Sequence, residues 1–127
     1  MTDLNMNVLI VDDYKSMLRI IEHVLKQLGF KNVHQAMDGV TALRMLHEGQ
    51  FGLVISDWNM QPMTGLQLLK EVRNDEKLKG MPFIMVTAES KTENIIAAKE
   101  AGVNNYIVKP FNAETLKQKL SAVLGSF

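Results

Sequence analysis

The sequence predicts an α/β fold in which one parallel sheet of five strands carries helices on both faces. Short apolar runs alternate five times with stretches of helical periodicity along the chain. Four of these runs are almost continuously apolar, which is typical of parallel strands that are covered on both faces. The chain has 127 residues, the usual length of one domain, so we expect a single domain over residues 1–127.

The expected strands are the five apolar runs. They cover Asn7–Val11, Val33–Ala36, Gly52–Ser56, Pro82–Val86 and Asn105–Val108. The second run is more polar than the others, so we place it at an edge of the sheet. Parallel strands need crossover connections, and an edge second strand beside a buried first strand favours the doubly wound, flavodoxin-like order 2-1-3-4-5.

Helices are expected between the strands. In the first helix, Met17, Ile21 and Leu28 belong to one apolar stripe, and Gly29 is expected to end the helix in a left-handed conformation. A similar stripe runs from Ala113 to Leu124 in the last helix. The fourth helix has a poor stripe, because its apolar residues 95–98 are consecutive, so part of its apolar surface must face outward.

Several helix starts have recognisable capping residues. Thr64 with Gln67 and Ser90 with Glu93 each match a capping box, in which side chains satisfy two unpaired amides reciprocally. Asp38 and Asn112 are expected to cap the second and fifth helices.

Charged and hydroxyl side chains follow four of the expected strands. Asp12 and Asp13 follow the first strand, Asp57 the third, Thr87 the fourth and Lys109 the fifth. Each alone has an ordinary explanation, such as a helix cap or a solvated amine. The carboxyl ends of parallel strands meet at one edge, however, so all five side chains should converge there. Three carboxylates repel one another unless a cation lies among them, and hard oxygen ligands favour Mg²⁺ or the similar Mn²⁺.

The composition excludes several other functions. Fourteen basic residues balance fourteen acidic ones, which gives no nucleic-acid footprint, and the absence of cysteine excludes disulfides and Cys-based zinc sites. The polar start is not a signal peptide and the apolar runs are too short to cross a bilayer, so we expect a cytoplasmic protein without membrane insertion. Dinucleotide, P-loop and nucleophile-elbow motifs are absent, and the three histidines are expected at the surface.

Four motifs together resemble the receiver domain of two-component response regulators. They are Val-Asp12-Asp13, Ser-Asp57-Trp-Asn-Met, Val-Thr87-Ala and Val-Lys109-Pro-Phe. The resemblance covers essentially the whole chain and is closest to stand-alone CheY-type chemotaxis regulators. It agrees with the expectation that no output domain follows the fifth helix.

The resemblance implies a role for each residue of the expected site. Asp57 would be the phosphoacceptor, which takes a phosphoryl group from a phosphohistidine of a sensor histidine kinase. Lys109 would pair with the phosphoryl oxygens and Thr87 would hydrogen-bond one of them, and the Lys109–Pro110 bond would be cis. The residues that would hold Mg²⁺ are Asp13, Asp57, Asn59 through its backbone carbonyl, and Asp12 through water.

The resemblance also implies a switch and an output surface. Tyr106 would follow Thr87 inward on phosphorylation. The output surface would comprise the fourth helix, fifth strand and fifth helix, and the candidate partner contacts are Lys91, Ile95, Tyr106 and Lys119. The implied partners are a sensor histidine kinase, a flagellar motor switch protein or other target, and a phosphatase. We expect a monomer that is no enzyme but promotes its own phosphorylation and dephosphorylation at aspartate.

Two positions depart from the family pattern. Gln61 stands where members usually have proline, which here is Pro62, and Thr64 stands where chemotaxis members often have an acidic residue. The geometry of the loop after Asp57 and the lifetime of the phosphoryl group are therefore open.

Two alternative functions remain besides a switch for the flagellar motor. The first is a phosphate sink that drains a kinase shared with another regulator. The second is an aspartyl-phosphate hydrolase of the haloacid-dehalogenase type. That class has Asp-x-Asp after a strand, whereas position 59 here is Asn, and a cap domain does not fit in 127 residues.

Overall fold

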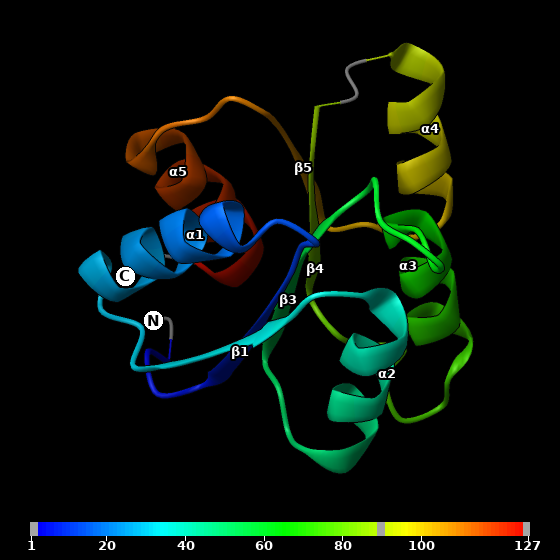
Figure 1. Cartoon of the computed structure of the whole chain (residues 1–127), viewed down its shortest axis with the longest axis horizontal. Coiled ribbons are helices and arrows are strands. Elements are labelled where there is room, and N and C mark those ends of the chain that lie inside the picture. Colours follow the sequence, from blue (N-terminus) through cyan, green and yellow to red (C-terminus); the bar gives the residue numbers. More distant parts are fainter. Residues whose placement is uncertain (1–2, 89–90, 126–127) are drawn as a thin grey trace.

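The chain alternates five strands with five helices over the residues that the structure, a computed structural model, describes: 3–88 and 91–125 (Figure 1). The first half of the chain forms β1 (Asn7–Val11), α1 (Lys15–Gln27), β2 (Asn32–Ala36), α2 (Gly39–Glu48) and β3 (Leu53–Asp57). The second half forms α3 (Gly65–Asn74), β4 (Phe83–Thr87), α4 (Thr92–Glu100), β5 (Asn105–Val108) and α5 (Ala113–Leu124).

All five strands are parallel and lie in the order β2-β1-β3-β4-β5, as predicted. β2 is an edge strand and is largely exposed, whereas β3 and β4 are buried throughout. The predicted third and fourth strands each ended one residue too early. Asp57 and Thr87 still belong to the ladder, because they pair with Val86 and Val108, so these polar residues end their strands instead of following them.

Helices cover both faces of the sheet and create two cores. α1 and α5 lie on one face and α2, α3 and α4 on the other, as the sheet seen nearly edge-on shows (Figure 1). Side chains alternate between the two cores along a strand: Val8 and Ile10 of β1 pack beneath α1 and α5, and Leu9 packs on the opposite side. The near-continuous apolar strands of the sequence are explained by this double coverage.

Three of the predicted helix starts are confirmed. The Asp38 carboxylate accepts a hydrogen bond from the Thr41 amide at 2.7 Å, and the Asn112 side chain accepts one from the Thr115 amide at 2.8 Å. Both bonds of the Thr64 capping box are present at the start of α3. These side chains satisfy amides that have no partner within the first turn of a helix.

The start of α4 is described only from Lys91 onward. Lys91 occupies the N-cap position and makes no side-chain capping bond, and the expected capping box of Ser90 with Glu93 falls outside the described residues because Ser90 does. The predicted end of α1 is confirmed, since Gly29 has a left-handed φ of 106°.

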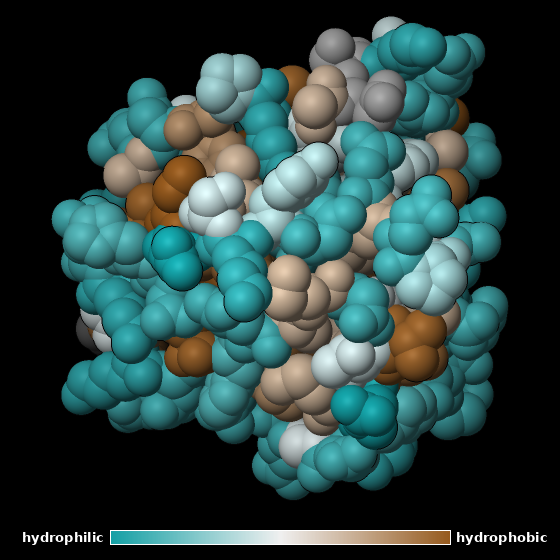
Figure 2. All heavy atoms as spheres, viewed as in Figure 1, coloured by the Kyte–Doolittle hydropathy of each residue, from teal (hydrophilic) through white to brown (hydrophobic). Residues whose placement is uncertain are grey.

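The surface seen in Figure 2 is largely hydrophilic, and its hydrophobic residues form separate spots instead of one continuous patch. His23, His34 and His47 are exposed, as expected. No helix in the described ranges has both the length and the apolar character needed to cross a membrane.

Candidate functional site

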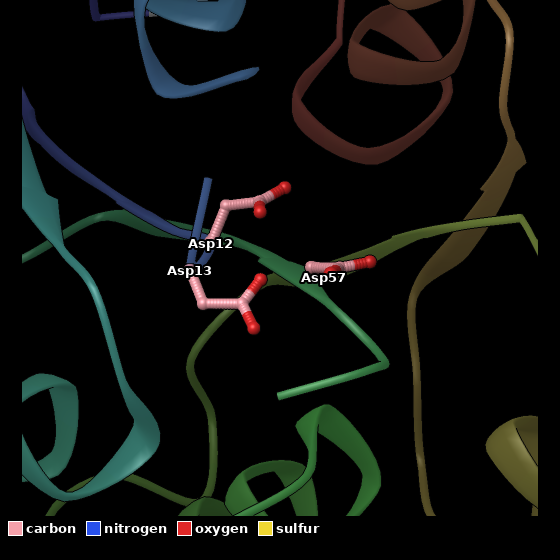
Figure 3. A group of neighbouring side chains, drawn as sticks. All are labelled: Asp12, Asp13 and Asp57. Atoms are coloured by element: carbon pink, nitrogen blue, oxygen red, sulfur yellow. The ribbon is translucent and has the colours of Figure 1, made fainter. Parts of the chain in front are cut away.

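Three carboxylates meet at the carboxyl edge of the sheet. Asp12 and Asp13 directly follow β1, and Asp57 is the last residue of the neighbouring strand β3 (Figure 3). One oxygen atom from each carboxylate lies within 4.8 Å of the other two. Asp12 and Asp57 are buried and Asp13 is exposed, so the cluster opens to solvent on the Asp13 side. The predicted convergence of these three carboxylates is confirmed.

Lys109 supplies a positive charge to this cluster. Its ammonium Nζ lies 3.2 Å from Asp12 Oδ2 and 3.3 Å from Asp57 Oδ1. The backbone places this side chain, because the Lys109 amide donates to the Thr87 carbonyl at 2.8 Å and thereby extends the β4–β5 ladder. The Lys109–Pro110 bond is cis, as the resemblance implied.

Asp12 has both of its carboxylate oxygens engaged. Oδ1 accepts a hydrogen bond from the Tyr14 amide at 2.9 Å, and Oδ2 pairs with Lys109. Tyr14 is the N-cap residue of α1, so Asp12 also organises the start of that helix, which was its ordinary explanation. The side chain is only 1% exposed, and its orientation is therefore set by these two partners.

Asp57 is held in an environment that disfavours its ionised form. Burial is the largest cause that raises the pKa of Asp57, and the negative charge of Asp12 is the second. The ammonium of Lys109 and a hydrogen bond from the Trp58 backbone act in the opposite direction without cancelling the effect. One lysine is therefore insufficient to neutralise the cluster.

The donor set fits a small divalent cation. All three groups are carboxylates, the hard oxygen ligands that Mg²⁺ and Mn²⁺ prefer, and the cluster carries more negative than positive charge. Asn59 is exposed and lies two residues beyond Asp57 in the loop after β3, so it is near the cluster in the chain. The arrangement also suits a nucleophilic carboxylate that must approach an anionic group, since a cation offsets the repulsion.

Thr87 and Tyr106 lie on strands β4 and β5, on the side of β3 that is away from β1. Thr87 ends β4 and is fully buried, and Tyr106 is buried on the adjacent strand β5. Tyr106 pairs with Met85, which lies two residues before Thr87, so all three side chains point to the same face of the sheet. The Tyr106 ring meets the Trp58 ring edge-on at a centroid distance of 6.4 Å.

The candidate partner contacts are unequally exposed. Lys91 is exposed at the start of α4, Ile95 is half-buried against the core, and Lys119 of α5 is half-buried. The Lys119 carbonyl accepts a hydrogen bond from the Asn105 side chain at 3.3 Å. Tyr106 is buried in this conformation, so it would have to turn outward to contact a partner.

Sequence reasoning missed three features beside Asp57. The Ser56 hydroxyl donates to the Asp57 carbonyl at 2.9 Å. Gly65 packs directly against the backbone of Asp57 and Trp58. The Gln61–Pro62 bond is cis, like the bond before Pro110. The glycine that directly follows the capping threonine was the only local signal of this packing.

Comparisons with known proteins agree with this geometry. Residues 8–121 match the response regulator receiver domain. The chain is 56% identical to the chemotaxis protein CheY-3 of Vibrio cholerae over 119 residues, which cover 94% of this chain and 92% of the relative. It is 54% identical to the chemotaxis protein CheY of Pseudomonas aeruginosa, over 93% of this chain and 95% of the relative.

Solved structures show the same fold. The chemotaxis response regulator CheY4 of Vibrio cholerae has a TM-score of 0.87 at 38% identity, with 94% of this chain and 99% of that chain covered. The receiver domain of a sensor histidine kinase from Pseudomonas aeruginosa has a TM-score of 0.86 at 27% identity, with 96% and 99% covered. That protein holds a magnesium ion coordinated in its active-site cleft.

Proposed function

The chain belongs to the response regulator receiver domains and acts as a phosphorylation-activated signalling switch, and we propose that Asp57 is its phosphoacceptor in a chemotaxis pathway. One observation carries the assignment of Asp57. Its carboxylate is buried at the sheet edge, 3.3 Å from the Lys109 ammonium and beside the carboxylates of Asp12 and Asp13. The hydrolase alternative is set aside by family membership.

The proposed reaction is the transfer of a phosphoryl group from a phosphohistidine. A carboxylate oxygen of Asp57 forms a bond to phosphorus while the phosphorus–nitrogen bond breaks, and the bonding electron pair remains on the imidazole of the donor. Lys109 moves its ion pair from the Asp57 carboxylate to an oxygen of the transferred group. Thr87 donates its hydroxyl to another of those oxygens.

The proposed cation site comprises Asp12, Asp13, Asp57 and the backbone carbonyl of Asn59. A bound Mg²⁺ or Mn²⁺ supplies positive charge to the oxygens of the transferred group and offsets the repulsion among the carboxylates. The same site opens to solvent at Asp13, so water can reach the phosphoryl group. On this basis the chain promotes its own phosphorylation and dephosphorylation.

The proposed partners are those that the family resemblance implies, and the relatives named as chemotaxis proteins support them. In this proposal a sensor histidine kinase supplies the phosphoryl group, a phosphatase removes it, and a flagellar motor switch protein is the target. The residues proposed to contact the target are Lys91, Ile95, Tyr106 and Lys119. The alternative function as a phosphate sink shares the same chemistry and differs only in having no phosphorylation-dependent target.

The phosphoacceptor is tested with acetyl phosphate and Mg²⁺. We expect one phosphoryl group per chain at an acid-stable, base-labile position, and no label on Asp57→Asn, because an amide is a poor nucleophile. Asp3→Asn is the matched control, since Asp3 lies before the opposite end of β1, and it should label normally. Equal labelling of Asp57→Asn would contradict the assignment.

The cation site and the target are tested separately. Trp58 is the only tryptophan and adjoins Asp57, so its fluorescence should change saturably with Mg²⁺, and Asp13→Ala should weaken the response.

A pull-down on a motor switch protein, with and without a phosphoryl mimic, distinguishes the switch from the phosphate sink. Binding that is independent of the mimic, or absent, would favour the sink.

A further inference from the structure

The space around Gly65 is closed by the backbone that carries the phosphoacceptor. Gly65 is buried as the first residue of α3. A β-carbon at this position would overlap the Asp57 carbonyl oxygen and lie 2.9 Å from the Trp58 Cα atom. It would also lie 2.9 Å from the Met85 sulfur. Side chains can rotate away from such an overlap, but a backbone carbonyl cannot move without turning the peptide that follows Asp57.

The peptide after Asp57 is held from two sides. The Ser56 hydroxyl donates to the Asp57 carbonyl at 2.9 Å, and Gly65 packs against the same carbonyl. The next carbonyl, that of Trp58, accepts the Gly65 amide at 2.8 Å and the Met60 amide at 3.1 Å. Gly65 therefore fixes the start of α3 against Asp57 and Trp58, where the loop over positions 58–64 begins.

This contact matters for the site because Asn59 lies within the loop. The direction of the Asn59 carbonyl depends on the peptides at Asp57 and Trp58, since they are directly before it in the chain. The direction of the Asp57 carboxylate depends on the same backbone. Any residue larger than glycine at position 65 would have to displace one of these peptides or the start of α3.

We propose that Gly65 is a positioning residue for phosphoryl transfer: its missing side chain sets the peptide geometry that aims Asp57 and the Asn59 carbonyl at the cation. The proposal rests on the function proposed above. It also rests on the helix propensity of the residue. Alanine is the better helix former, yet position 65 is a glycine, and a β-carbon there would overlap the Asp57 carbonyl.

The proposal predicts a specific defect in Gly65→Ala. We expect Mg²⁺ affinity, measured by calorimetry, to fall at least tenfold, and the rate of labelling by acetyl phosphate at saturating Mg²⁺ to fall at least tenfold. Two controls separate this from general destabilisation. Gly80→Ala makes the same substitution where nothing lies within 4 Å, and Val72→Ala removes buried volume from the other end of α3. Both controls should stay within twofold of the wild type.

A measurement on the wild type covers the case in which Gly65→Ala fails to fold. Coupling between two sites is reciprocal, so Mg²⁺ should in turn stabilise the Gly65–Trp58 hydrogen bond. We expect saturating Mg²⁺ to slow hydrogen exchange of the Gly65 amide at least threefold and to leave the Thr115 amide of α5 unchanged. Equal slowing of both amides, or of neither, would overturn the proposal.

The outcomes also distinguish a failure of the proposed function from a failure of the proposed role of Gly65. A wild-type chain that neither binds Mg²⁺ nor accepts a phosphoryl group would refute the proposed function. A wild type that does both, together with a folded Gly65→Ala that matches Gly80→Ala, would refute only the role of Gly65.

Discussion

Helices α3 and α4 cover the same face of the sheet, but they are attached to the molecule in different ways. α3 starts with a complete capping box and buries Gly65, Leu68, Leu69 and Val72. α4 has no side-chain cap, and Ala98 is its single buried residue within the described part of the helix. The neighbouring Ile96 is 48% exposed. Fewer buried contacts leave α4 less tightly held than α3.

The two ends of α4 are also unequal. Arg73, in the last turn of α3, donates to the Gly102 carbonyl and to the Asn104 side chain, both at 2.9 Å. It also donates to the carbonyls of Lys79 and Met81, and burial lowers the pKa of its guanidinium. These bonds fix the segment that follows the C-terminal end of α4. At the start of α4, the N-cap residue Lys91 makes no side-chain capping bond.

This difference matches the strands that the two helices follow. α3 follows β3, which ends in Asp57, and α4 follows β4, which ends in Thr87. On the proposed function, phosphoryl transfer therefore takes place beside the firmly packed helix, where geometry must be conserved during transfer. The response is expected beside the loosely packed helix, where a modest free energy can shift the population of conformations.

The largest expected effect comes from removing a buried side chain of α3. Leu68→Ala should lower the free energy of unfolding by about 2–5 kcal/mol, because it leaves a cavity in a fully buried position. Urea denaturation measures the change, provided that the unfolding free energy of both proteins falls with urea concentration at the same slope. A loss below about 1 kcal/mol would mean that α3 is no better held than α4, and the comparison would fail.

The next effect concerns Thr87, which is proposed to couple phosphorylation of Asp57 to target binding. Thr87→Ala should leave labelling of Asp57 largely intact while removing the gain in affinity for a motor switch protein. A hydrogen bond to a charged group contributes about 1.5–3 kcal/mol, so the gain lost should be about tenfold to a hundredfold. Thr87→Ser keeps the hydroxyl and is the matched control. Full enhancement in Thr87→Ala would show that the signal travels through another element.

A smaller effect concerns the stability lost when the buried carboxyl group of Asp57 ionises. Burial and the charge of Asp12 raise the pKa of Asp57 above its ordinary value of 3.8, so the folded state retains this proton to higher pH than the unfolded state. Without Mg²⁺, the free energy of unfolding therefore falls as the pH rises from the unfolded pKa of Asp57 to its folded pKa. Above the folded pKa the loss of stability is complete. Asp57→Asn removes this cost.

The measurement is the difference in unfolding free energy between Asp57→Asn and the wild type across pH. The variant should be the more stable protein at pH 7, and its advantage should shrink as pH falls toward 3.8 and below. Saturating Mg²⁺ should reduce the advantage at pH 7, because a bound cation offsets the same charge. An advantage that grows on acidification would contradict the sign of the shift.

The sequence was sufficient for the sheet and for the residues at its edge, because both depend on local patterns. Apolar runs predicted the strands, and the charged residues that end or follow them predicted the convergence of Asp12, Asp13, Asp57 and Lys109. The exact end of β3 was missed, since Asp57 joins the ladder only by pairing with Val86 on another strand. Pairing of that kind leaves no trace in the local pattern.

Other features depend on residues that are distant in the chain. Arg73 binds groups 29 and 31 positions away, and the restriction at Gly65 comes from the backbone of another element. Neither can be read from composition or periodicity.

The smallest expected effect is at Ile96, and it is the most direct test of how α4 is held. Nearly half of this side chain is already in water, so Ile96→Ala should change the free energy of unfolding by less than about 0.5 kcal/mol. Ile95→Ala, one position earlier and half-buried against the core, should cost more. Urea denaturation of both variants gives the comparison within a single helix. If Ile96→Ala costs as much as Leu68→Ala, then α4 is packed as firmly as α3, and a phosphoryl group at Asp57 would need far more than one hydrogen bond to move it.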